Sequence, residues 1–173
     1  MNYLDRILEH YAGSFDIEKD FSIGGKTAAA YGHFATVSEK YVLTPKANLW
    51  KIEGFEHILF FEADAVDRDT LIQTRELMQN HMAPKLVCKG EKYPPKDHMY
   101  SYVTVVYLVQ NPPAEELQKE IRSFRYEQDY LFTFRGHVEG HLVVMDLSTG
   151  KAYTNKAAKH LKALYEKTYA DSN

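Results

Sequence analysis

The feature that most constrains the fold is an alternating segment that runs directly into a pair of glycines. Within residues 15–23, Phe or Ile occupies every odd position but one, and polar residues stand between them. A period of two is typical of a half-buried strand. Gly24-Gly25 can supply the positive φ angles of a two-residue hairpin turn, so a return strand is predicted at about 27–37. Such a turn sets the register and places Asp16 opposite His33 on a polar face.

The rest of the chain alternates between strand patterns and isolated helix patterns. Apolar stripes at helical spacing lie within 4–11, 71–82, 117–124 and 157–168. Strand patterns lie at 41–43, 47–52, 57–63, 100–109, 130–134 and 142–147. We expect 47–52 and 57–63 to pair as a hairpin around Gly54-Phe55, and Pro84 to close the second helix before an exposed loop. The segment 100–109 is apolar on both faces, which predicts a central, covered strand.

These patterns together predict the fold class and the domain organisation. Alternating hairpins and isolated helices indicate an α+β fold, a mainly antiparallel sheet of about six or seven strands with four helices packed on it. A length of 173 residues suits one domain over 1–173. Hydrophobic residues make up 45% of the chain and charged residues 26%, which is typical of a globular protein.

Composition also excludes several classes of function. The chain has 21 Lys+Arg against 24 Asp+Glu, a net charge of −3, and so lacks the overall basic character expected of a nucleic-acid-binding protein. No apolar run approaches the ~18–20 residues of a membrane span, and the first residues do not form a signal peptide. We therefore expect a cytoplasmic protein without a nucleic-acid or membrane partner. The general impression of the sequence, apart from these observations, is that of a bacterial protein.

Two local features are weak candidates for chemistry. Residues 24–27 match the end of a phosphate-binding loop, but Asp20 stands where its first glycine belongs and the pattern around it is that of a hairpin. Cys88 is the single cysteine, which excludes an internal disulfide and paired-cysteine metal motifs. Since no local signature ties a base to Cys88, we expect it to be a packing residue.

The strongest candidates for metal ligands are His137, Glu139 and His141. On a strand these residues point to one face, and they are ligand types of zinc and iron sites. The two histidines would stand ~13 Å apart on a straight strand, too far to share an ion. Two adjacent members could share one with a ligand from a neighbouring strand. The alternative is a solvated strand face, and we expect no tightly bound metal or other cofactor.

A second acidic group lies where a predicted strand gives way to the second helix. Its members are Glu62, Asp64, Asp67 and Asp69. Carboxylates in such a place can hold magnesium beside a phosphate. They are also what a helix N-terminus favours without any ligand, and we expect this structural role.

No complete catalytic constellation is evident in the sequence. The leading hypothesis is therefore a binding module without cofactor, for a small ligand or a protein partner. The alternative is a metal-dependent hydrolase that uses His137, Glu139 or His141 with acids from Glu62–Asp69. The sequence leaves the oligomeric state open, and a homodimer is one option.

Overall fold

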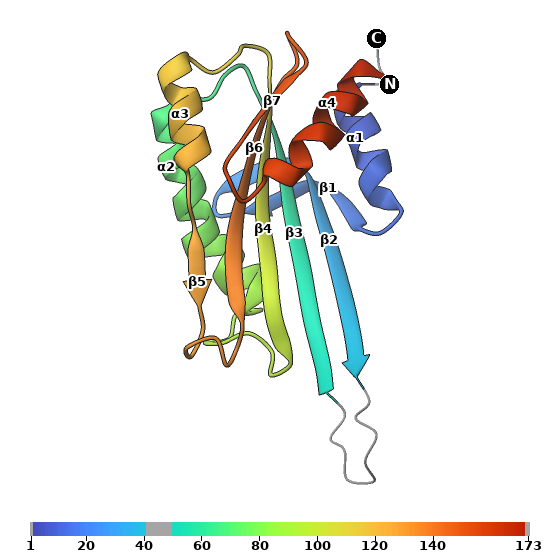
Figure 1. The fold of residues 1–173 in the computed structure, drawn as a ribbon, viewed down its shortest axis with the longest axis vertical. Helices are drawn as coiled ribbons and strands as arrows, with labels where there is room; N and C mark the ends of the chain where they lie inside the picture. Colours follow the sequence, from blue (N-terminus) through green and yellow to red (C-terminus); the bar gives the residue numbers. More distant parts are fainter. Residues whose placement is uncertain (1, 41–49, 172–173) are drawn as a thin grey trace.

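The structure, a computed structural model, describes residues 2–40 and 50–171. Among these residues seven strands form one sheet in the order β1-β2-β3-β4-β6-β5, with β7 also paired to β6 (Figure 1). The strands are β1 (Asp16–Ile23), β2 (Lys26–Lys40), β3 (Trp50–Ala63), β4 (His98–Val109), β5 (Glu127–Asp129), β6 (His137–Asp146) and β7 (Lys151–Thr154). The helices are α1 (Tyr3–Ala12), α2 (Arg68–Leu77), its π-helical continuation η1 (Met78–Val87), α3 (Glu115–Ser123), the short 3-10 helix η2 (Lys159–Leu161) and α4 (Lys162–Ala170).

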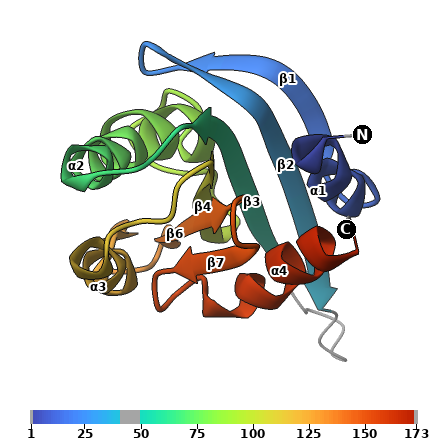
Figure 2. The same ribbon diagram turned by 90° about the horizontal axis from the view of Figure 1, so that it is seen from above.

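Helices cover both faces of the sheet, so the protein has the predicted α+β fold. Figure 2 shows α2 and α3 on one side and α1 and α4 on the other. Each side has its own apolar cluster: Met78, Ile121 and Leu142 belong to the first, and Ile7 and Tyr165 to the second. No helix in the described ranges combines the length and apolarity needed to cross a bilayer.

The first hairpin confirms the predicted register. Asp16 is the Cα partner of His33 across β1 and β2, and the turn glycines Gly24 and Gly25 have φ angles of 59° and 73°. β1 forms one end of the sheet as described. Within β1, Asp20 has a φ of 56°, a left-handed conformation that few non-glycine residues adopt.

The centre of the sheet is parallel, although most strand pairs are antiparallel. β4 lies between β3 and β6 and runs parallel to both, while the outer pairs are antiparallel. All seven residues from Val103 to Val109 are buried, which confirms 100–109 as a central strand. Parallel neighbours need long crossovers, and α2 with η1 and then α3 supply them.

The predicted hairpin around Gly54-Phe55 is wrong, because β3 continues through these residues. It pairs with β2 from Lys40↔Trp50 to Ala30↔Phe60. Gly54 does not form a turn. It leaves space for the side chain of Tyr100, since a Cβ at position 54 would lie 2.3 Å from Cζ of Tyr100. The predicted strand at 41–43 lies outside the described residues.

Two further expectations fail for local reasons. Pro84 lies inside η1; the wider π-helical turn continues past it, with the Cys88 amide donating to the Ala83 carbonyl over 2.9 Å. Residues 130–134 form a turn in place of a strand, because Leu131, Phe132 and Thr133 all have positive φ.

Candidate functional site

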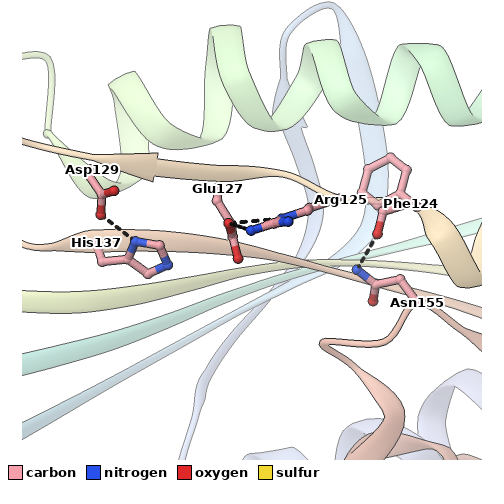
Figure 3. Close-up of polar contacts among 6 residues, drawn as sticks. All are labelled: Phe124, Arg125, Glu127, Asp129, His137 and Asn155. Carbon is pink, nitrogen blue, oxygen red and sulfur yellow. Dashed lines mark hydrogen bonds and ion pairs between the residues drawn. The ribbon is translucent and has the colours of Figure 1, made fainter.

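Two short strands, β5 and β7, pair with different parts of the same edge of β6. A buried asparagine, Asn155, lies in the space between them. β5 pairs with 137–139 and β7 with 143–146. Asn155 is 1% exposed. Its Nδ2 donates to the carbonyls of Phe124 and Gly140 over 3.2 and 3.0 Å, and its Oδ1 accepts from the amides of Leu142 and Ala158 over 3.0 and 3.2 Å. Figure 3 shows the bond to Phe124.

Two cavities meet around Asn155, and together we call them the edge groove. The first has a volume of about 540 Å³ and lies between residues 122–127, residues 139–140 of β6 and residues 155–157. The second, of about 460 Å³, lies between α3, residues 152–156 and the start of α4. They share Arg122, Asn155 and Lys156. Both volumes fall within the usual range for small-molecule sites.

Charge is distributed unevenly along the edge groove. Among the described residues that line the second cavity, the charged ones are all cationic: Arg122, Lys156, Lys159 and Lys162. Lys162 also lies 3.6 Å from Glu166. Arg125 also lines the first cavity, but so do the carboxylate residues Glu127 and Glu139. One end of the groove is thus cationic and the other end is mixed.

A compact group of three ligand-type side chains lies at the mixed end, and two of them, Glu127 and Glu139, line the first cavity. Glu127, His137 and Glu139 each offer one ligand atom, and these atoms lie within 4.8 Å of one another. Glu127 and Glu139 are Cα partners across β5 and β6, as are Asp129 and His137. The Nδ1–H of His137 donates to Asp129 Oδ1 over 2.7 Å, and the other ring nitrogen lies on the side of Glu127 (Figure 3).

The two candidate histidines serve different surroundings, as the sequence predicts. His137 is half-buried on Asp129, whereas the His141 side chain is 3% exposed and its Nε2 lies 2.8 Å from Glu139 Oε1. The ring of Tyr102 stacks on that of His141 with centroids 4.8 Å apart. Burial lowers the pKa of His141, and Glu139 only partly offsets this. His141 therefore orients Glu139 rather than joining His137.

Glu62 of the second acidic group lies far from Glu139 along the sheet. Glu62 pairs with Leu108 of β4, which pairs with Met145 of β6. Met145 is six residues beyond Glu139, or about 20 Å along the strand. Asp67 caps α2 by accepting from the Thr70 amide over 2.7 Å, and this contact lowers the pKa of Asp67. The predicted role at a helix N-terminus is confirmed for Asp67.

Cys88 is a packing residue in the structure. It is 4% exposed and belongs to the apolar cluster under η1. Burial raises the pKa of its thiol, and a hydrogen bond from the Tyr130 hydroxyl offsets this in part. A nucleophilic cysteine needs the opposite shift.

Sequence reasoning missed a row of stacked rings on the face of the sheet opposite to the side chains of His137, Glu139 and His141. His33 and His57 stack with centroids 4.9 Å apart and planes 3° apart, and Phe55 lies 5.9 Å from His98. The Tyr31 hydroxyl is hydrogen-bonded to His57 Nδ1 over 2.8 Å. Burial, reinforced by the nearby cations, lowers the pKa of His57 to about 3. The alternation of β2 and β3 hints at a shared face, but only the strand order brings these rings together.

The described residues thus define an α+β protein with a charged groove at the edge of its sheet. Residues 1–167 match a family model described as a domain of unknown function (DUF8052), and the chain belongs to this family. No curated protein and no solved structure matches the chain.

Proposed function

We propose that this protein is a bacterial, cytoplasmic binding module that holds a small anionic molecule in the edge groove. The observation that carries the proposal is the set of four cationic side chains around the second cavity. The chain as a whole has a net charge of −3, so this concentration of positive charge is local. A concave site with one sign of charge raises the local concentration of a ligand of the opposite sign.

The chemistry of the lining favours a phosphate or carboxylate group. Arg122 borders both cavities, and its planar guanidinium can donate two parallel hydrogen bonds to either group. Three exposed lysines, Lys156, Lys159 and Lys162, add electrostatic attraction for an anion but do not fix its orientation. The ring of Tyr153 lines the same cavity and offers an apolar surface for the rest of the ligand.

Calorimetric titration of the purified protein with inorganic phosphate, pyrophosphate, citrate and glucose 6-phosphate tests the proposal. We expect at least one of these anions to bind, with an affinity that falls as sodium chloride is raised. Arg122→Gln should weaken that binding at least tenfold. Lys119→Gln removes the same charge from an exposed position of α3 outside the groove and should change it less than twofold. Binding that is equally sensitive to both changes, or absent for all four anions, would contradict the proposal.

A metal-dependent hydrolase is the second candidate, and one observation favours it. The group of Glu127, His137 and Glu139 has the residue types of a metal site. Glu62 does not contribute to it, because it lies about 20 Å away along the sheet, and Asp67 caps α2 instead. This candidate therefore depends on whether the group binds a metal by itself.

A further inference from the structure

We infer that Glu127, His137 and Glu139 form a binding site for one divalent transition-metal ion, with zinc the best match. The three side chains come from two neighbouring strands. Glu127 faces Glu139 directly across β5 and β6, and His137 lies two residues before Glu139 on the same face. This site goes beyond the proposed anion binding and does not depend on it.

The geometry needs only a small contraction to bind an ion. The ligand atoms lie within 4.8 Å of one another, whereas ligands at ~2.1 Å around a tetrahedral zinc stand ~3.4 Å apart. Glu127 is exposed and Glu139 half-buried, so changes of side-chain rotamer can close the difference. Glu127 now pairs with Arg125, whose Nε lies 3.0 Å from its carboxylate. Arg125 is exposed, so its side chain can move into solvent when a metal ion binds the Glu127 carboxylate.

Two of the three ligands already have orienting partners. Asp129 accepts from Nδ1 of His137 over 2.7 Å, which leaves Nε2 of the neutral ring as a lone-pair donor. His141 holds Glu139 over 2.8 Å from a buried position. Carboxylates on ligating histidines and hydrogen bonds to ligating carboxylates are the usual outer shell of protein metal sites. This shell distinguishes the group from a merely acidic surface.

Three protein ligands leave one position of a tetrahedral ion open. Glu127 and Glu139 also line the first cavity of the edge groove, so the open position would face that cavity. Histidine with carboxylates suits zinc, iron or manganese, and zinc binds such sites more tightly than manganese or iron(II). If the proposed function holds, an anion in the groove could complete the coordination of the ion.

Zinc titration of tag-free protein, freed of metal by a chelator that is then removed, tests the site. With zinc chloride alone we expect one equivalent to bind. Glu127→Gln, His137→Ala and Glu139→Gln should each weaken binding at least tenfold, with the circular dichroism spectrum unchanged. Asp129→Asn should retain one equivalent at an affinity reduced roughly 10–100-fold, because it perturbs the outer shell. His10→Ala, an exposed histidine of α1, should have no effect.

Zinc binding below half an equivalent, or binding that survives all three ligand changes, would overturn the inference. A site that prefers magnesium and tolerates His137→Ala would overturn the assignment to a transition metal. Arg122→Gln separates the two proposals, since it should weaken anion binding at least tenfold and leave zinc binding intact. Anion titration of the metal-free protein tests the groove alone, and zinc titration without an anion tests the metal site alone.

Discussion

Asn155 donates a hydrogen bond to the Phe124 carbonyl across 3.2 Å and so joins the end of β7 to the end of α3. The same side chain satisfies Gly140, Leu142 and Ala158. Asn155→Ala leaves several of these groups buried without a partner, and each costs about 1–3 kcal/mol. We expect the free energy of unfolding in urea to fall by roughly 3 kcal/mol or more.

The control is Asn111→Ala, which removes an exposed asparagine bonded to the Asp64 carbonyl. This change should lower the free energy of unfolding by under ~0.5 kcal/mol. Equal losses would contradict the role of Asn155.

Gly140 permits a close approach between β6 and its covering residues. A Cβ there would lie 2.8 Å from both Tyr126 Cβ and Met78 Sδ. Met78 can adjust, but the Tyr126 Cβ moves only with its backbone. Gly140→Ala should therefore lower the free energy of unfolding by ~1–3 kcal/mol. Gly13→Ala, with nothing within 4 Å and a φ of −68°, should be neutral or slightly stabilising. A thermal melt in which both variants behave alike would count against this explanation.

His57 should make stability depend on acidity. Its pKa is lowered from 6.5 to about 3 in the folded protein by burial, and then by the charges of His33, Lys89 and His98. The unfolded chain therefore binds a proton that the folded chain does not, and stability falls as pH decreases from about 6.5 towards 3. The contribution is about 1.4 kcal/mol per pH unit at most.

Urea unfolding of the wild type and of His57→Gln at pH 7, 6 and 5 measures this slope. Between pH 7 and pH 5 the free energy of unfolding should fall substantially less in His57→Gln than in the wild type, whatever the stability of the variant at pH 7. His10→Gln, which alters an exposed histidine of α1, should keep the slope of the wild type. An unchanged slope in His57→Gln would mean that other groups cause the acid sensitivity.

Cys88 should react slowly with thiol reagents in the native protein. Burial limits access and raises the pKa of the thiol, so little thiolate is present at neutral pH. With Ellman's reagent we expect the reaction in native buffer to be at least 100-fold slower than in strong denaturant. Comparable rates in the two conditions would show that the region around Cys88 opens readily.

The parts of the fold that local chemistry determines were predictable from the sequence. The register from Asp16 to His33 follows from two glycines and an alternation broken only at Lys19, and Asp67 begins α2 as its acidic character indicates. The span 130–134 is different. Its residues have high strand propensity, yet three of them adopt positive φ, because the chain must reverse between β5 and β6. Tertiary constraint outweighs propensity there.

The candidate site was predictable only in part, for a related reason. His137 and Glu139 share a strand face by simple alternation, and the two residues can be chosen from the sequence alone. Glu127 joins them because the reversal at 130–136 sets the pairing of Glu127 with Glu139, and no local pattern announces that pairing. The cations of the edge groove come from α3 and from residues 156–162, between β7 and the first residue of α4, and these segments meet only through the complete sheet.

β1 has a consequence for how copies of this chain meet one another. A terminal strand presents unpaired backbone groups that can template the addition of a strand from another molecule. Asp16, Glu18, Lys19 and Asp20 are all exposed on β1, and the left-handed backbone at Asp20 distorts the strand midway. A second copy that paired there would meet a mainly acidic strand on a distorted backbone. This border of the sheet is therefore a poor template for fibril-like stacking.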